Sequence, residues 1–490
     1  MTTDKKVDNL KRECRFATYV PPPEHGEPDI HVIKEIIHHP DGRVEPSIKI
    51  IENFKRPYYV TKKALRNHND HKEWEKLENV DKYASTQTDL VKNASRSLGM
   101  PWFKGDLRKL SKSPYLYGTD ITSTAIIKQM YLDKFDIRTP YSLAVMDTET
   151  DVVNGTGEII LISLTYRKHI YCVAIGDYFK GLANPLDQCH KVIDKYLSRI
   201  LREREATVVL VHEKTPVDGI KYCADKAHEL MPDFLAFWNI DFDMTKILQA
   251  CEKEGVDPKD IFSDPRVPAP YKSFKYKRGP NKKVTASGKV TPIKLAAQWH
   301  TVTCPASFYF IDAMCVYKHV RTGLPEEQSY ALQAILTKEI GEGKLSFQEA
   351  DHVEGLKWHQ LMQADYKYEY SAYNIMDSVR VEQLDEKTKD ASITFPMFSG
   401  CSDFSRFNSQ PRRTVDKLHH HLLKEGYVIG VSSSEMATEM DDETLGLEDW
   451  ITTLPAHTVC DNGLKCIEEF PDLVTNIRRD VADQPYSRSA

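Results

Sequence analysis

The sequence lacks any apolar run near the 18 or more residues needed to span a bilayer, and its polar beginning, MTTDKKVDNLKREC, is not a signal peptide. Its ten cysteines include no C-x-x-C pair and no His/Cys cluster at zinc spacing. We therefore expect reduced, mostly buried thiols. These absences predict a cytoplasmic protein with no membrane partner.

Two nucleotide-related motifs are also incomplete. The string GEGKLS, beginning at Gly341, lacks the full G-x-x-x-x-G-K-S/T spacing of a phosphate-binding loop. The string YLYGTDIT, residues 115–122, lacks one of the two aspartates of a polymerase Tyr-Gly-Asp-Thr-Asp turn, and we expect a loop there. A formal net charge of −6 argues against general coating of nucleic acid but allows a local basic channel.

The length of 490 residues predicts about three domains. Residues 1–140 are predicted to form an N-terminal α+β domain. Within it, apolar segments on both sides of Pro40-Asp41-Gly42 predict a hairpin, and the highly charged residues 61–98 predict a pair of solvated helices.

Residues 141–392 have a different pattern, in which short β-rich runs precede and then alternate with helices. The expected strands are SLAVMD, EIILISLTY, HIYCVAI, TVVLVHE and FLAFWN, and helices are expected near residues 190–204 and 217–230. Three consecutive strands followed by alternation predict an α/β domain with a mixed sheet covered by helices. This is the order of elements in an RNase H-like nuclease core.

The first acidic element is Asp147 with Glu149, at the end of the expected strand SLAVMD. Strand residues two apart project from the same face, so both carboxylates point at one spot. A bound divalent cation would keep both ionised and makes this a candidate hard-metal site. The alternative is an acidic strand end that faces solvent.

The second acidic element is Asp243, at the junction between the strand FLAFWN and a helix that follows it. One interpretation is a helix N-cap, because aspartate accepts hydrogen bonds from helix-start N–H groups. The other is a metal ligand at the same junction, and the two roles are compatible.

The third acidic element is Asp377, four residues after Tyr373 on an expected helix. This spacing puts the phenol and the carboxylate on one helical face. A phenol there can orient an attacking water while the carboxylate binds a metal. The alternative is an amphipathic helix on which the two side chains only share a rim.

The three acidic elements, in this order, resemble the Exo I, Exo II and Exo III motifs of proofreading 3′→5′ exonucleases. The motifs are Asp-x-Glu, Asn239-x-x-Phe-Asp and Tyr-x-x-x-Asp. The enzymes of this family use four carboxylates and a tyrosine. The resemblance implies that Asp147, Glu149, Asp243 and Asp377 hold two Mg²⁺ or Mn²⁺ ions. It further implies that Tyr373 orients the water nucleophile and that Asn239 contacts DNA. Phosphodiester hydrolysis needs such a metal pair, and carboxylates suit hard cations.

The segments YNIMDSVRVEQLDEK, FYFIDAMCVYKHV and SYALQAIL resemble phage-type family B DNA polymerases, most strongly between residues 141 and 390. Residues 393–490 would then be a mainly helical linker and the incomplete start of the palm. The resemblance implies a proofreading part of a viral replication polymerase that acts on single-stranded and primer-template DNA. Palm, fingers and thumb would lie on a separate polypeptide or have been removed by truncation, so this chain alone should not polymerise DNA.

Three alternatives accompany this resemblance. There is one residue fewer between Asn239 and Asp243 than phage enzymes usually have, so Asp241 is a rival ligand to Asp243. The chain could instead be a nucleic-acid-binding or assembly subunit with an idle nuclease site. The triple His419 to His421 is expected at the surface, because consecutive helical residues diverge by about 100° and cannot converge on one ion.

A basic run between residues 271 and 300 is the remaining nucleic-acid signal. Cations for phosphates alternate there with rings for bases, as single-strand binding requires. Gly279-Pro280-Asn281 is expected as a hairpin tip, and the position resembles the hairpin that separates strands in family B enzymes; a solvated basic loop is the alternative. The predicted DNA-contacting residues are Lys275, Lys277, Arg278, Lys282 and Lys283.

Overall fold

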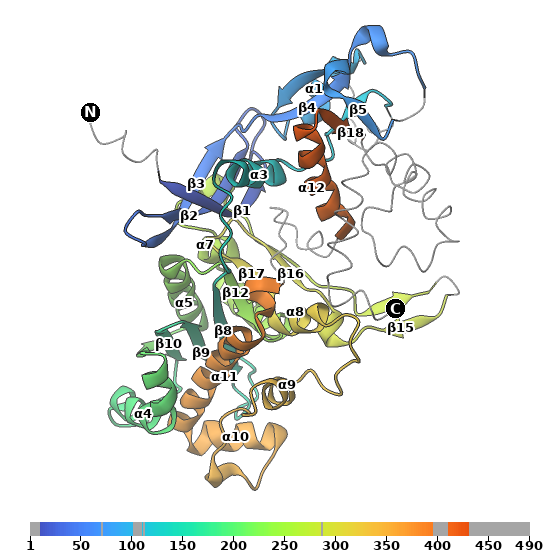
Figure 1. The fold of residues 1–490 in the computed structure, drawn as a ribbon. Helices are drawn as coiled ribbons and strands as arrows, with labels where there is room; N and C mark the ends of the chain where they lie inside the picture. The colour runs from blue at the N-terminus through green and yellow to red at the C-terminus, as the bar shows by residue number, and fades with distance from the viewer. Residues whose placement is uncertain are drawn as a thin grey trace, which may run out of the picture.

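The computed structural model describes residues 10–69, 72–100, 110, 113–285, 288–394 and 410–430, with the side chains of the last segment from residue 415 on. Of the expected linker and palm start, residues 393–490, only residues 393, 394 and 410–430 lie within these ranges. The described part is a mixed α/β structure around one six-stranded sheet. Figure 1 shows this sheet in the lower part of the molecule and the first strands of the chain in the upper part.

The chain begins with two small antiparallel sheets. The predicted hairpin around Gly42 is confirmed: its two strands pair in register, and Gly42 adopts a positive φ of 85°, which glycine tolerates without a Cβ clash. The elements are β1 (Lys11–Val20), β2 (Ile30–His38) and β3 (Val44–Glu52) in the first sheet, β4 (Arg56–Thr61), β6 (Val80–Ser85) and β7 (Leu116–Tyr117) in the second, and helices α1 (Leu90–Leu98) and α3 (Ser123–Phe135).

The predicted helix pair over residues 61–98 is wrong. Among the residues described there, only α1 is an α-helix, and strands β5 (Trp74–Lys76) and β6 precede it. The segment VDKYAS of β6 buries Val80 and Ser85 at its ends and alternates between half-buried and exposed residues along its length. This period-two pattern is typical of a strand, and the high charge of the segment concealed it. The string YLYGTDIT contains the short strand β7, where a loop was expected.

The central sheet has the order β11-β10-β9-β8-β12-β17. Strands β8, β9 and β10 are antiparallel to their neighbours in this trio, whereas β12 is parallel to both β8 and β17, and β11 is parallel to β10. The predicted mixed sheet is therefore confirmed. Its strands are β8 (Leu143–Thr150), β9 (Ile159–Tyr166), β10 (His169–Ile175), β11 (Thr207–Glu213), β12 (Phe234–Phe237) and β17 (Tyr309–Asp312).

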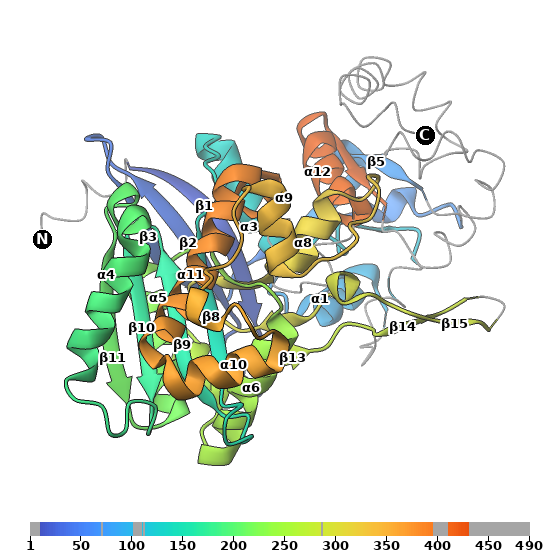
Figure 2. The same cartoon turned by 90° about the horizontal axis from the view of Figure 1, so that it is seen from below.

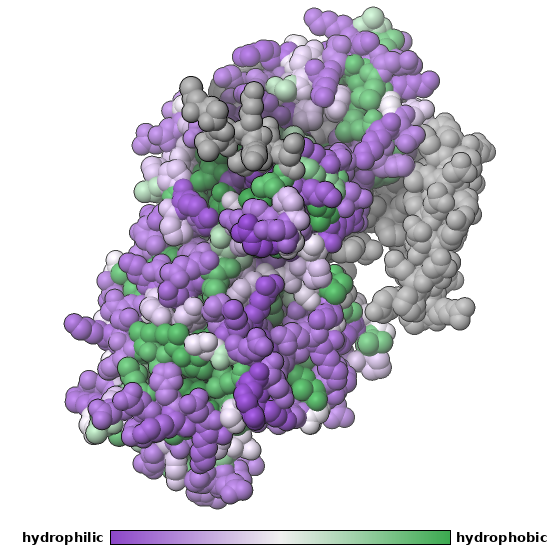
Figure 3. Space-filling model, turned by 60° about the vertical axis from the view of Figure 1, so that its left-hand side comes forward, coloured by the Kyte–Doolittle hydropathy of each residue, from purple (hydrophilic) through white to green (hydrophobic). Residues whose placement is uncertain are grey.

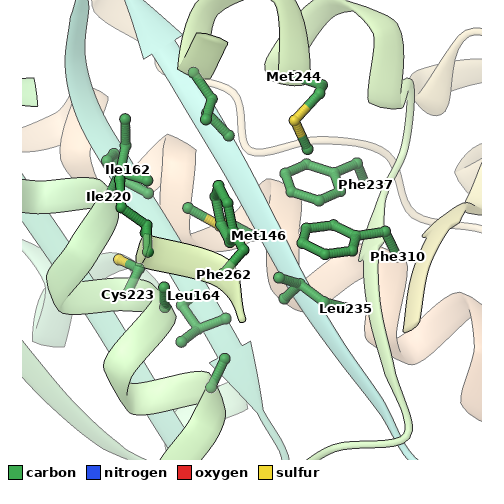
Figure 4. Close-up of a cluster of buried hydrophobic side chains, with 14 of the residues drawn as sticks. Met146, Ile162, Leu164, Ile220, Cys223, Leu235, Phe237, Met244, Phe262 and Phe310 are labelled. Carbon is green, nitrogen blue, oxygen red and sulfur yellow. The ribbon is translucent and has the colours of Figure 1, made fainter. Parts of the chain in front are cut away.

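Helices cover both faces of this sheet (Figure 1). Met146 of β8 faces a cluster that includes Ile220, Met244 and Phe262, and Figure 4 shows these side chains packed together. Full burial of each such side chain contributes about 1.5–3 kcal/mol. The helices on this face are α5 (Pro216–Leu230), α6 (Ile240–Glu254) and α7 (Pro258–Phe262); those on the other face are α4 (Pro185–Glu203), α8 (Ala313–Val320), α9 (Leu332–Glu339), α10 (Gly355–Asp365) and α11 (Lys367–Thr388).

Buried charges connect the first small sheet to the central sheet. The Lys34 ammonium of β2 lies 3.1 Å from Asp233 and donates 2.8 Å to the carbonyl of Met231, just before β12. Burial lowers the pKa of Lys34 to about 8, against the opposing effect of Asp233. Asp233 in turn accepts from the backbone N–H of Ser142, which precedes β8. The N-terminal sheet thus fixes the starts of the two strands that position the acidic residues.

The described end of the chain packs on the N-terminal region. Helix α12 (Gln410–Lys424) leads to β18 (Tyr427–Ile429), which pairs with β5. The expectation that all three histidines lie at the surface is wrong for His419, which is 2% exposed beside Gly118. It shares a helical face with Leu422, and that face points toward the N-terminal sheets.

The face drawn in Figure 3 is largely hydrophilic, with apolar residues in smaller groups between the charged ones. Within the described ranges, every helix is too short or too polar to cross a bilayer. The cysteines in these ranges are unpaired and buried, as the sequence predicts; they are Cys14, Cys172, Cys189, Cys223, Cys251, Cys304 and Cys315.

Candidate functional site

Strand β8 places Asp147 and Glu149 on one face of the central sheet. Leu143 and Val145 have the same parity and pack toward α8, α9 and α11, so the two carboxylates face that layer as well. Thr148 points to the opposite face, toward α6. The pairing of β8 with β9 shifts register between Glu149 and Thr150, and such bulges re-aim side chains at functional sites.

Helix α11 brings Asp377 to the same two carboxylates. One oxygen from each of Asp147, Glu149 and Asp377 lies within 4.8 Å of the others. Asp377 is 4% exposed, and its Oδ1 is buried without a hydrogen-bond partner among the described residues. An unpartnered carboxylate oxygen in such a place costs free energy unless a cation or water satisfies it.

Asp243 approaches the site from α6 and is held by Thr148. Its Oδ1 accepts from the backbone N–H of Thr148 at 3.0 Å and from the Thr148 hydroxyl at 2.7 Å. The N-cap interpretation is wrong, because the helix begins at Ile240 and its N-cap is Asn239. The start of α6 is fixed by buried Asp312, which accepts from the N–H of Ile240 at 3.1 Å. Asp243 is outside the 4.8 Å group, but its charge is close enough to raise the pKa of Asp147.

Asp241, the rival of Asp243, is engaged elsewhere. It accepts from the Tyr276 hydroxyl at 2.6 Å and from Nε of Arg278 at 2.9 Å. Arg278 also donates 2.7 Å to the Thr245 hydroxyl. Asp241 therefore anchors the basic segment on α6, whereas Asp243 contacts Thr148 of β8, the residue between Asp147 and Glu149 in the chain.

Tyr373 and Asp377 are joined by a residue that sequence reasoning missed. The Lys344 ammonium donates to the Tyr373 hydroxyl at 2.9 Å and to Oδ2 of Asp377 at 2.5 Å. Lys344 belongs to the string GEGKLS, whose spacing indicates only an incomplete phosphate-binding loop. A lone lysine in a loop gives no sequence signal for a partner about thirty residues away.

Two further residues of α11 hold the carboxylates of β8. The Tyr370 hydroxyl donates to Oε2 of Glu149 at 2.5 Å, and the Asn374 amide donates to Oδ2 of Asp147 at 2.8 Å. The sequence analysis missed both, although Tyr370, Asn374 and Asp377 lie at helical spacing in the sequence YSAYNIMD, residues 370–377. The signal that could have found them is this run of polar residues along one side of an otherwise buried helix.

The carboxylates of the cluster favour their protonated forms when no cation is bound. Burial raises the pKa of Glu149 to about 7, and Asp377 adds to this effect while Tyr370 opposes it. Burial also raises the pKa of Asp243 to about 7, against its hydrogen bonds from Thr148. The pKa of Asp147 rises through burial and through the charges of Asp243 and Glu149. Carboxyl groups crowded in this way release their protons when a cation binds.

This donor set fits a hard divalent cation. The ligand atoms are carboxylate oxygens, which Mg²⁺ and Mn²⁺ prefer, and they come from different elements that a packed core fixes. Asp377 also supplies the oxygen without a partner. Lys344 beside Asp377 offsets only part of the negative charge.

Part of the basic segment, residues 271–300, projects from the body of the protein (Figure 2). The predicted position of the hairpin tip in this segment is wrong. Strand β13 (Lys275–Lys277) pairs with β16 (Thr301–Thr303), whereas the hairpin consists of β14 (Lys282–Val284) and β15 (Val290–Pro292). Gly279-Pro280-Asn281 therefore links two strands that belong to different sheets. The four predicted lysines, Lys275, Lys277, Lys282 and Lys283, are exposed.

Two residues at the start of α6 complete the surroundings of the cluster. Asn239 is the N-cap, but its side chain makes no capping hydrogen bond. Phe242, next to Asp243, is 47% exposed. An exposed aromatic ring beside an acidic cluster is suited to stacking on a base.

No family model matches this chain, and no curated protein matches its sequence, so the functional argument rests on the residues and their geometry.

Proposed function

We propose that this chain is the proofreading part of a phage-type family B DNA polymerase and hydrolyses DNA from the 3′ end at a two-metal site. The observation that carries the proposal is the convergence of the carboxylates of Asp147, Glu149 and Asp377. Asp243 is hydrogen-bonded to Thr148, the residue between Asp147 and Glu149 in the chain. The strand order β10-β9-β8-β12-β17, with the first three strands antiparallel and the last two parallel to β8, supports an RNase H-like core.

The carboxylates would hold the metal ions that this chemistry needs. Two divalent cations, held by Asp147, Glu149, Asp243 and Asp377, would stabilise the negative charge on the attacking and leaving oxygens of the phosphodiester. The protein fixes the carboxylates beforehand through Tyr370, Asn374 and Thr148. A site held in this way needs little reorganisation when the phosphate arrives.

Tyr373 and Lys344 would prepare the water nucleophile. The ammonium of Lys344 donates to the Tyr373 oxygen at 2.9 Å, so the phenol oxygen is an acceptor in this contact. Burial and the nearby Asp377 raise the pKa of Tyr373, so the phenol stays protonated. A neutral phenol can orient a water but cannot deprotonate it, which makes Tyr373 an orienting group.

Single-stranded DNA would enter along the basic segment. Exposed lysines of β13 and β14 can neutralise phosphates, while Phe242 offers an exposed ring and Asn239 an amide that is not used to cap α6. Arg278 would anchor β13 on α6 and would not bind phosphate, because Asp241 already neutralises its guanidinium. Primer-template DNA and a separate polypeptide with the polymerase centre are the partners that the proposal requires.

The polarity and metal dependence of degradation test the proposal. A 5′-labelled single-stranded oligonucleotide is incubated with the full chain and Mg²⁺, Mn²⁺ or a chelator. We expect a ladder that shortens from the 3′ end with either metal, no products with chelator, and protection by a 3′-terminal phosphorothioate. Undegraded DNA in both metals would support the idle-site alternative, and release from the 5′ end would contradict the assignment.

A further inference from the structure

Helix α10 packs directly against the tyrosines of α11. The rings of Tyr370 and Tyr373 stack with centroids 5.7 Å apart and planes inclined by 9°. His359 of α10 contacts both rings edge-on, at 5.8 Å from Tyr370 and 6.1 Å from Tyr373. Trp358 adds a contact of 4.9 Å to Tyr373. Trp358 and His359 therefore pack against the two tyrosines that reach the acidic cluster and restrict the movement of their rings.

The hydroxyl of Tyr370 has all its hydrogen-bonding capacity in use. It lies 2.5 Å from Oε2 of Glu149, 2.8 Å from Nδ1 of His359 and 3.1 Å from Nε2 of Gln363. A phenol has one hydrogen and two lone pairs. When Glu149 is ionised, as cation binding requires, its carboxylate accepts the hydrogen, and the amide of Gln363 donates to one lone pair of the Tyr370 oxygen. His359 must therefore carry a hydrogen on Nδ1 and donate it to the other.

Gln363 ties this arrangement to the end of β8. Its Nε2 donates 2.9 Å to the carbonyl of Thr150, and its Oε1 accepts from the N–H of Val152 at 3.0 Å. The side chain is 4% exposed, so these bonds are shielded from water. Helix α10 is thus fixed relative to the strand that carries Glu149, and His359 cannot drift from Tyr370 without breaking buried hydrogen bonds.

We propose that His359 and Tyr370 are positioning residues for Glu149: the Nδ1–H of His359 donates to the Tyr370 hydroxyl, which commits its own hydrogen to Oε2 and leaves Oε1 for a divalent cation. This inference rests on the proposed role of Glu149 as a metal ligand. Neither residue touches substrate in this role. Outer partners of metal ligands typically change metal affinity by about 10- to 100-fold when removed.

The chain offers variants that separate this role from packing. Tyr370→Phe keeps the stacked ring and removes the hydrogen bond to Glu149. His359→Leu removes the donor, whereas His359→Asn places an amide nitrogen where Nδ1 lies and should restore the donation. Tyr368→Phe is the matched control, because it removes a hydroxyl from a half-buried tyrosine of the same helix that packs on Phe179 instead.

The test is calorimetric titration of the full chain with Mn²⁺, with the melting temperature of each metal-free variant measured alongside. We expect Tyr370→Phe and His359→Leu to weaken Mn²⁺ binding by about tenfold or more. His359→Asn should remain within about threefold of wild type, and Tyr368→Phe should bind as wild type does. Recovery in the asparagine variant would show that donation, and not ring packing, is responsible.

Two results would overturn the inference. The first is Mn²⁺ affinity within about twofold of wild type in both Tyr370→Phe and His359→Leu. The second is an asparagine variant that melts as wild type does but binds as weakly as the leucine variant. A wild-type chain that binds Mn²⁺ but leaves DNA intact defeats only the proposed nuclease function, whereas a wild-type chain that binds no Mn²⁺ defeats both.

Discussion

The Lys344 ammonium lies between the Asp377 carboxylate and the Tyr373 hydroxyl, 2.5 Å from the first and 2.9 Å from the second. Burial disfavours its charge, yet Asp377, Asp147 and Glu149 together raise the pKa of Lys344. The lysine is therefore a permanent cation within the acidic cluster. It contacts both the phenol that would orient the water nucleophile and a carboxylate that would hold a metal ion.

Replacing Lys344 by methionine tests this relationship. We expect turnover on single-stranded DNA to fall by about 10- to 100-fold, because a charge-assisted hydrogen bond contributes roughly 1.5–3 kcal/mol and each 1.36 kcal/mol is about tenfold in rate. Mn²⁺ affinity should be kept or improved, because a competing positive charge is removed. Lys338→Met, which breaks only an exposed pair with Glu327, is the control. A rate equal to wild type would show that Lys344 has no part in catalysis.

The variant Tyr373→Phe separates the orientation of water from metal binding. The phenol touches Lys344 and contributes no oxygen to the 4.8 Å carboxylate group. We expect a rate loss of about tenfold, much less than for a carboxylate, with unchanged Mn²⁺ affinity in calorimetry. Loss of Mn²⁺ binding would instead mean that the ring is a structural support.

The basic segment should contribute to DNA affinity and not to turnover. Replacing Lys275, Lys277, Lys282 and Lys283 by alanine removes exposed charges, and each lost phosphate contact should flatten the single-strand salt slope by about 0.7. Turnover at saturating DNA should stay near wild type. Fluorescence anisotropy across a salt series measures the slope, and an unchanged slope would mean a solvated loop.

The matched control for that experiment replaces by alanine four exposed lysines in or beside α4, β11 and α5, at the β11 edge of the central sheet. These are Lys191, Lys195, Lys214 and Lys221. Arg278 is left in place in both variants, because its ion pair with Asp241 holds β13 on α6. A control variant that loses as much slope as the test variant would show that net charge alone sets the affinity.

Metal-free stability should decrease as pH rises through a window to which Glu149 and Asp243 both contribute. The pKa of Glu149 rises from 4.5 to about 7 on folding, so the folded state binds a proton between these values and stability falls as pH rises through them. In chelator, Glu149→Gln should therefore gain melting temperature relative to wild type between pH 5 and 7.5. A gain of at least about 2 °C is expected, because 1 kcal/mol corresponds to roughly 2–4 °C in a domain of 150–250 residues.

Two comparisons check that interpretation. Saturating Mn²⁺ should raise the melting temperature of wild type more than that of Glu149→Gln at pH 7.5, since binding stabilises the folded state by mass action. Glu203→Gln, which alters an exposed pair with Arg199, should show no pH-dependent gain. A pH-independent difference between wild type and Glu149→Gln would contradict the assignment of the shift to Glu149.

The sequence predicts those parts of the fold that depend on local patterns. The strand ending in Asp147 and Glu149 follows from an apolar run, and the hairpin at Gly42 follows from its turn residues. The face shared by Tyr373 and Asp377 follows from helical spacing. Each of these features is encoded within a few residues, so a period of two or 3.6 is enough to find it.

The rest depends on contacts between distant segments. Lys344 and Tyr370 reach the carboxylates through a loop and a helix whose positions are set by packing, and no local pattern reports it. The tip at Gly279-Pro280-Asn281 was wrong because the partner of β13 lies beyond the hairpin, in β16. The preference for Asp243 over Asp241 rests on the match to the motif and stays a prediction, whereas only the structure reveals that Asp241 anchors Arg278.

The most direct measurement of the central claim is the rate of nucleotide release from the 3′ end by Asp147→Asn and Asp377→Asn. The control is Glu382→Gln, a buried carboxylate on the same helix as Asp377 that pairs with Arg204 and lies outside the cluster. We predict a loss of at least about a thousandfold in both aspartate variants, because a lost metal ligand costs several kcal/mol and each 1.36 kcal/mol is about tenfold. The control should retain wild-type turnover if it folds to the same melting temperature. Equal rates in wild type and both aspartate variants would contradict the account.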